Sequence, residues 1–306
     1  MPDTLTTIGS QAFFTTRLTT ITIPPSVVSI GESAFSAGAN NWISVLNTVN
    51  FSGSSLTTLS NYAFARTFVT SVTIPPSIVT IGDGAFYGCS ELAELVLSGN
   101  SLTYIGADSF YGTDITSITI PPTLTILGQR AFAYCPFLNI VTFSEPSSLE
   151  TINTNAFQNC TLLVHLTLPL SLTLIATSAF QGCTSLLSVT IPQNVVFIDT
   201  NAFQGCTSIG SVVFNCRNNA LTILGQNCFA GTTSINPSNN DSLYSLIAKG
   251  YNVGGLNNYN LQYAGFNTTG IPTTPPHPPY VPCFNEGTKI LCFNLLKSIS
   301  LILPFS

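Results

Sequence analysis

Two consecutive segments of the chain have the same length and nearly the same pattern. The segment from Thr161 to Cys183 reads TLLVHLTLPLSLTLIATSAFQGC, and the next, from Thr184 to Cys206, reads TSLLSVTIPQNVVFIDTNAFQGC. Each contains a strand-like run, a proline, an isoleucine and the ending AFQGC. Self-similarity with a period of about 20 to 30 residues indicates a solenoid in which each repeat forms one turn.

The phenylalanine of this pattern recurs along most of the chain. Ten copies occur at steps of 22 to 29 residues: Phe13, Phe35, Phe64, Phe86, Phe110, Phe132, Phe157, Phe180, Phe203 and Phe229. A single repeat has about five large apolar side chains, too few to offset the entropy lost when its backbone is ordered. Each repeat is therefore expected to fold only when stacked on its neighbours.

The strand of each repeat shows a two-residue alternation. In the first complete copy, Ile21 and Ile23 point to one side and Thr22 to the other. Pro24 and Pro25 then end the strand, because proline cannot donate a hydrogen bond to the ladder and fixes φ.

The segment Leu18 to Phe35, LTTITIPPSVVSIGESAF, resembles the BspA-like leucine-rich repeat family, whose pattern is close to LxxIxIPxSVxxIGxxAFxxC. The resemblance covers about residues 1–231. It implies a right-handed solenoid of about ten turns with one short parallel β-strand per turn, and it favours protein binding over catalysis.

The repeat pattern stops at Thr232, and the rest of the chain divides into three regions. Residues 232–270 are expected to form a short helical cap, with helices at 241–250 and 256–265, because Asp241 and Gly250 have the positions of an N-cap and a stop. Residues 271–282 form a proline-rich linker that is expected to be extended. Residues 283–306 are an irregular tail.

The composition excludes several classes of function. The chain has 45% apolar but only 6% charged residues, a net charge of −5 and seven basic residues, so it has no basic stripe for nucleic acid. Two histidines and few carboxylates provide no pair for acid–base catalysis. We expect a protein that is not an enzyme and needs no cofactor.

Five of the nine cysteines follow a repeat phenylalanine by three positions: Cys89, Cys135, Cys160, Cys183 and Cys206. Metal binding is one interpretation, but the absence of a CxxC pair argues against zinc. A column of small buried side chains is favoured, with free thiols in a reducing compartment. No secretory signal is visible, and the chain opens midway through a repeat, so a cytoplasmic location and either an upstream start or a gene fragment are expected.

The outward strand positions form a surface rich in hydroxyl groups. The candidate binding residues on it are Thr73, Thr119, Thr142, His165, Thr167 and Thr190. One hypothesis is a face that binds another protein, as solenoid surfaces often do. The alternatives are a solvated face without a partner and an ice-binding face, although Glu94, Ile140 and Val213 interrupt the array that ice binding needs.

The longest insert between repeats runs from Ala37 to Asn47 and contains Trp42 and Ile43, which are unusual in a polar loop. Packing against the convex side and contact with a partner are both compatible with these two residues. The favoured function is thus a non-enzymatic interaction scaffold that binds a protein of unknown identity through the outer strand face and the inserted loops.

The segment VPCFNEGTKIL at 281–291 resembles the opening of Hint (hedgehog/intein) autoprocessing domains. The resemblance implies that Cys283 is the nucleophile for an acyl shift at the Pro282–Cys283 bond. The chain ends 23 residues later without another histidine, so such a domain would be truncated and inactive. An apolar stretch at 290–305 has Lys297 in its middle and is too short for a membrane span.

Overall fold

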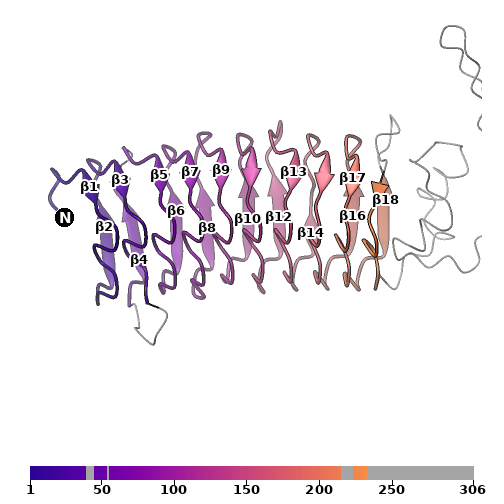
Figure 1. Cartoon of the computed structure of the whole chain (residues 1–306), viewed down its shortest axis with the longest axis horizontal. Coiled ribbons are helices and arrows are strands. Elements are labelled where there is room, and N and C mark those ends of the chain that lie inside the picture. Colours follow the sequence, from indigo (N-terminus) through magenta and orange to yellow (C-terminus); the bar gives the residue numbers. More distant parts are fainter. Residues whose placement is uncertain (39–44, 54, 215–222, 233–306) are drawn as a thin grey trace, which may run out of the picture.

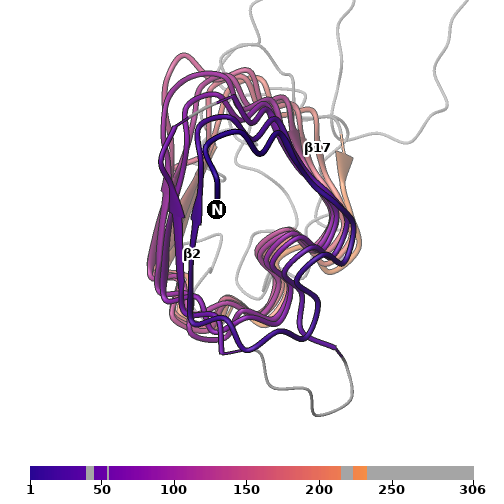
Figure 2. The same ribbon diagram turned by 90° about the vertical axis from the view of Figure 1, so that its left-hand side faces the viewer.

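The computed structural model describes residues 1–38, 45–53, 55–214 and 223–232. Over these residues the chain coils into one rod, with successive turns arranged along its length (Figure 1). Viewed down the rod, the turns superpose as stacked rings (Figure 2). The predicted solenoid is therefore confirmed, and the elements of this described part are all strands.

One side of the rod is formed by the even-numbered strands, which follow the alternating run of each repeat. Their inward side chains are buried and their outward ones exposed, as in the pattern Thr20 out, Ile21 in, Thr22 out, Ile23 in. The strands are parallel and form three sheets, of order β2-β4-β6-β8, β10-β12-β14 and β16-β18. Their bounds are β2 Thr20–Ile23, β4 Thr48–Phe51, β6 Ser71–Ile74, β8 Glu94–Leu97, β10 Ser117–Ile120, β12 Ile140–Phe143, β14 His165–Leu166, β16 Ser188–Ile191 and β18 Ser211–Phe214.

A second set of strands, each of two residues, lies on the opposite side of the ring, where β17 faces β2 in Figure 2. These odd-numbered strands form two parallel sheets, β1-β3-β5-β7-β9-β11 and β13-β15-β17-β19. Their bounds are β1 Thr7–Ile8, β3 Ser29–Ile30, β5 Thr58–Leu59, β7 Thr80–Ile81, β9 Tyr104–Ile105, β11 Ile126–Leu127, β13 Thr151–Ile152, β15 Leu174–Ile175, β17 Phe197–Ile198 and β19 Ile223–Leu224.

The expectation of one strand per turn was wrong, because the short segment of T-I-G type that follows the connection in each turn also pairs with its counterpart. Thr58 pairs with Thr80, and Leu59 with Ile81, in the same parallel register as the longer strands. The turn count is about nine rather than ten, because the first repeat starts at β1 and has no even-numbered strand before it.

The loops that carry the repeat phenylalanines have an alternating backbone. Arg130 and Tyr134, on either side of Phe132, have φ of 55° and 58°, in the left-handed region. The N–H groups of Arg130, Phe132 and Tyr134 donate to carbonyls of the following turn at 3.1, 2.8 and 2.7 Å, while those of Ala131 and Ala133 donate within their own turn. The loops therefore form a third hydrogen-bonded ladder between turns, in addition to the two sets of strands.

The ten repeat phenylalanines form one interior row. Each ring stacks on the next, with centroids 5.1 to 5.5 Å apart and planes within 10° of parallel. Eight of them, from Phe64 to Phe229, are fully buried, whereas Phe13 at the first turn is only partly buried. This row and the inward strand residues make one continuous core along the rod.

The regions expected after Thr232 lie outside the described residues. These are the helices at 241–250 and 256–265, the linker at 271–282 and the tail at 283–306. The insert residues Trp42 and Ile43 also lie outside the described residues.

Candidate binding surfaces

The even-numbered strands position the residues predicted to bind a partner. Thr73 lies in β6, Thr119 in β10, Thr142 in β12, His165 in β14 and Thr190 in β16, and Thr167 directly follows β14. All six point away from the core, and five are exposed while Thr142 is half-buried. We call this surface the even-strand face.

The structure brings some of these residues together and separates others. The hydroxyl groups of Thr119 and Thr142 are 3.0 Å apart, and Thr167 follows on the next turn, where its N–H donates to the Val141 carbonyl at 3.2 Å. Thr73 lies apart from this group, because its neighbour in register is Val96 and no strand pairing joins β8 to β10.

Two equivalent grooves interrupt the even-strand face. One lies where β4 and β6 pair only at Thr48 and Ser71, and it is lined by Phe51, Thr73 and Pro75 among others. The other lies where β8 and β10 are unpaired, and it is lined by the repeat-equivalent Leu97, Thr119 and Pro121.

At both grooves, the segment that follows the even-numbered strand differs between the two turns. It is longer and lacks proline in the first turn, and it begins with a Pro-Pro pair in the second. Their volumes are about 390 and 380 Å³. The predicted residues Thr73 and Thr119 therefore occupy the same position in two matched grooves.

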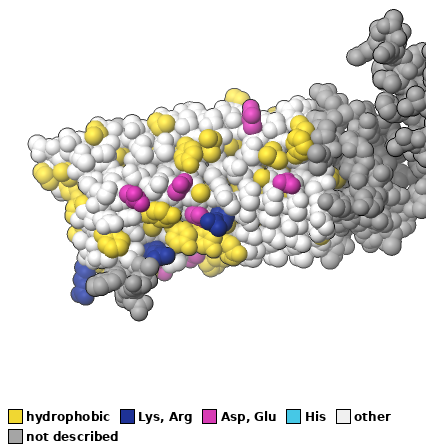
Figure 3. Space-filling view, in the orientation of Figure 1, with side chains coloured by type: hydrophobic (Ala, Val, Ile, Leu, Met, Phe, Trp, Pro, Cys, Tyr) yellow, Lys and Arg dark blue, Asp and Glu magenta, His cyan; other side chains and the backbone are white. Residues whose placement is uncertain are grey.

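A second surface was not predicted from the sequence. It lies on the loops beside the repeat phenylalanines, and we call it the tyrosine–arginine patch: Tyr62, Arg66, Tyr87, Asp108, Tyr111, Arg130 and Tyr134. Figure 3 shows hydrophobic side chains gathered around basic ones on the lower part of the rod, whereas the lower part of the described rod further from the N-terminus is mostly free of both.

Aromatic contacts organise the patch. The rings of Tyr87 and Tyr111 stack with centroids 5.1 Å apart, and Tyr134 tilts against Tyr111 at 5.2 Å. The guanidinium of Arg66 lies over the Tyr87 ring, 5.7 Å from its centroid, within the range of a cation–π contact. Partial burial raises the pKa of the Tyr111 hydroxyl above its ordinary value, so this hydroxyl stays protonated at neutral pH.

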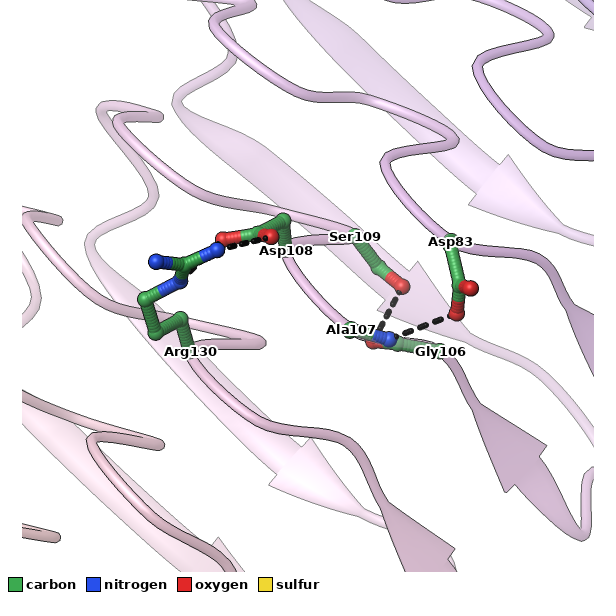
Figure 4. A network of polar contacts seen from close by, with 6 residues as sticks. All are labelled: Asp83, Gly106, Ala107, Asp108, Ser109 and Arg130. Carbon is green, nitrogen blue, oxygen red and sulfur yellow. Dashed lines mark hydrogen bonds and ion pairs between the residues drawn. The ribbon is translucent and has the colours of Figure 1, made fainter.

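An ion pair fixes the edge of the patch (Figure 4). Arg130 donates two hydrogen bonds to the Asp108 carboxylate, at 2.8 and 2.7 Å, and this bonding raises the pKa of the guanidinium. The turn that carries Asp108 is itself held, since the Ala107 N–H donates to the Asp83 carboxylate at 2.8 Å and the buried Ser109 hydroxyl donates to a backbone carbonyl of its own turn at 2.6 Å.

A groove of about 470 Å³ runs beside this patch. Aromatic side chains line it at Phe14, Tyr62 and Tyr87, and the Arg66 and Arg130 side chains border it. These are two of the three basic side chains that occur in the described residues, the third being Arg17.

The other repeats show that the fold does not require these side chains. Gln158, Gln181 and Gln204 occupy the position of Tyr87 and Tyr111, directly after the repeat phenylalanine. These glutamines form a side-chain ladder with hydrogen bonds of 2.9 and 2.7 Å.

Backbone strain supports the same conclusion. Arg66 and Tyr134 have φ of 60° and 58°, at a position where Gly182 and Gly205 stand in later turns. A bulky residue with left-handed φ costs about 1 kcal/mol or more compared with glycine.

The sequence signal for the patch was available, because its tyrosines and arginines stand at fixed offsets from the repeat phenylalanines.

The cysteines form the predicted buried column, and Cys89, Cys135, Cys160, Cys183, Cys206 and Cys228 are free and buried. Each thiol of the first five donates to the carbonyl of the repeat phenylalanine one turn earlier, at 3.1 to 3.2 Å. Thr67 and Thr113 stand at the equivalent position and bond the phenylalanine carbonyl of their own turn. Within the described residues, no group of His, Cys, Asp and Glu side chains could hold a metal ion.

The stacked parallel turns around a core of leucine, isoleucine and phenylalanine are those of a leucine-rich repeat solenoid. The family model described as BspA type leucine rich repeat region matches residues 6–139 and 136–249. The chain belongs to the BspA-type leucine-rich repeat family.

Several solved structures are similar to the chain. The chain is similar to a leucine-rich repeat protein from Bacteroides ovatus, with 28% identity and a TM-score of 0.59 over 77% of this chain and 64% of that protein. It is also similar to the pneumococcal vaccine antigen PcpA, with 23% identity and a TM-score of 0.45 over 72% of this chain and 69% of that one. A T. pallidum leucine-rich repeat protein matches with 21% identity and a TM-score of 0.45, over 82% and 88% of the two chains.

A comparison with curated proteins gave no match. The comparisons give no support to a Hint-like start at 283–291, and Cys283 lies outside the described residues. In the part of the chain that the structure describes, no helix could cross a membrane, and the apolar stretch at 290–305 lies outside that part.

Proposed function

We propose that the chain is a non-enzymatic scaffold that binds another protein across the even-strand face. The observation that carries this proposal is the pair of matched grooves at Thr73 and Thr119. They are two turns apart, or about 10 Å at the spacing of parallel strands. An extended polypeptide rises about 3.3 Å per residue, so a partner segment of only a few residues can reach both grooves.

The chemistry of the face is compatible with a protein partner. Hydroxyl groups at Thr119, Thr142 and Thr190 supply donors and acceptors, and exposed Val96 and Ile140 supply apolar contacts between them. Membership of a leucine-rich repeat family supports binding as the general role, because solenoids present extended surfaces of this kind.

The test uses the full chain as bait in a cell extract, with cross-linking and mass spectrometry to identify contact residues. The double variant Thr73→Lys and Thr119→Lys places a long charged side chain in each groove and is expected to reduce captured partner at least tenfold. Thr58→Lys, at an exposed position of β5, is the matched control and is expected to have no effect. Equal capture by the two variants would rule out the even-strand face.

A further inference from the structure

We propose that the groove of the tyrosine–arginine patch binds the proline-rich segment 271–282 of the same chain. The inference concerns a different surface from the even-strand face and does not depend on binding there. It starts from the finding that the patch side chains are replaced by glutamine, asparagine and glycine in turns with the same backbone, so folding does not explain them.

The chemistry of the groove favours an apolar, neutral occupant. Its two basic side chains already have partners, because Arg130 is paired with Asp108 and Arg66 lies on the Tyr87 ring. The aromatic side chains of Phe14 and Tyr62 remain available in the groove, whereas the Tyr87 ring is already contacted by Tyr111 and Arg66. The groove is also lined by Ser33, Ser36, Ala37, Gly38 and Ala65. Proline-rich segments in the polyproline conformation bind aromatic-lined grooves of this kind, since the segment is already extended and loses little entropy.

The spacing of prolines in the chain matches the spacing of the turns. Prolines recur at every third position in two sets, Pro272, Pro275 and Pro278, and Pro276, Pro279 and Pro282. A polyproline helix has three residues per turn and rises about 3.1 Å per residue, so each set would recur on one side about every 9 Å. Every second turn of the solenoid is about 10 Å away, because the rings of Tyr87, Tyr111 and Tyr134 on successive turns are 5.1 and 5.2 Å apart. Of these three rings, Tyr87 lines the groove, and Tyr111 and Tyr134 lie beside it.

The length of chain between the two elements permits the contact. Thr232 is the last described residue, and 38 residues separate it from Ile271. An extended chain spans at most about 3.3 to 3.6 Å per residue, so this connection can bridge more than 100 Å. The patch lies about six turns before Thr232, or roughly 30 Å at the spacing of parallel strands.

Photo-cross-linking in the full chain tests the proposal. Benzoylphenylalanine replaces Tyr280, a second version carries it at His277, and each protein is irradiated at low concentration before the cross-linked peptides are mapped. The expected products join the photoreactive residue to peptides containing residues 62–66, 87 or 108–111 of the same molecule. Mixing with isotope-labelled chain separates products within one chain from products between two chains.

The key variant is Arg66→Asn, Tyr87→Gln and Tyr111→Gln, which introduces residues that stand at the equivalent positions of later turns. It is expected to keep the circular dichroism spectrum and to reduce the cross-link yield at least tenfold. The Thr73→Lys, Thr119→Lys variant of the even-strand face is expected to leave the yield unchanged. Cross-links to other surfaces, cross-links mainly between two chains, or a yield unaffected by the patch variant would overturn the proposal.

Discussion

At the scale of single residues, the same side-chain position is filled in two chemically different ways. Three positions after the repeat phenylalanine, the described turns carry cysteine, as at Cys89, or threonine, as at Thr67 and Thr113, except for Gly38 in the turn of Phe35. Both side chains donate to a phenylalanine carbonyl, although the thiols of the cysteine column reach the carbonyl one turn earlier. The sequence predicted burial of the cysteines, but it did not show this hydrogen bond, because the acceptor belongs to a different turn.

The Cys89 thiol is expected to make stability depend on alkaline pH. Burial raises its pKa from 9.0 to about 11, so the unfolded chain loses this proton at lower pH than the folded chain. Between pH 9 and 11 the unfolded state binds fewer protons, and the free energy of unfolding therefore falls as pH rises, by roughly 3 kcal/mol for this group. Urea unfolding across this range measures the effect.

The matched variant is Cys89→Thr, which copies the equivalent position of Thr67 and Thr113. It is expected to remove the part of this loss of stability at alkaline pH that is due to Cys89. The losses due to Cys160, Cys183 and Cys228, whose pKa burial also raises, are expected to remain. If the variant and the natural chain show identical slopes of unfolding free energy against pH, the assigned burial of Cys89 is incorrect.

At the scale of elements, the sequence predicted the longer strands better than the shorter ones. The alternation in ITI and VTI runs extends over enough residues to be recognised, and the burial of Ile118 and Ile120 confirms it. The two-residue strands, such as β11, are too short for a periodic signal, and they are recognised only from their parallel pairing with neighbouring turns. The grooves form where the even-numbered strands of two neighbouring turns pair incompletely, as between β4 and β6. At both grooves, the first of the two turns has a longer connection after the strand than the second, so a groove cannot be read from one repeat alone.

At Gly128, the close approach of the preceding turn is expected to disfavour a side chain, although Ser60, Asn153, Ala176 and Asp199 fill the equivalent position of other turns. A Cβ added at Gly128 would lie 2.4 to 2.6 Å from backbone atoms of Gly106 and Ala107, which cannot move without shifting the preceding turn. Gly128→Ala is therefore expected to lower the free energy of unfolding in urea by about 1–3 kcal/mol, as for overpacking in a core.

Gly9 is the matched control, because it holds the same position in the first turn and a Cβ there would meet nothing within 4 Å. Gly9→Ala is expected to change stability little. An equal loss in both variants would show that conformational freedom of glycine, and not the close approach of turns, explains the pattern.

At the scale of the whole molecule, the repeat predicted the rod and its single core. The ten phenylalanines stand in one stacked row, as their spacing indicated. The outward residues of the strands were also assigned to the correct face. The tyrosine–arginine patch was not predicted. The fixed offsets of its residues from the repeat phenylalanines were a usable signal, but the contact of Arg66 with the Tyr87 ring depends on the loop conformation.

The central claim is that stacked turns share one row of buried phenylalanines, and replacing one ring tests it most directly. Phe132 is fully buried between Phe110 and Phe157, whereas Phe137, five residues later, is 49% exposed. In urea unfolding, Phe132→Ala is expected to cost about 3–5 kcal/mol, as for other buried aromatic residues. Phe137→Ala is expected to cost less than about 1 kcal/mol. Equal losses for the two variants, or a small loss for Phe132→Ala, would contradict the claim.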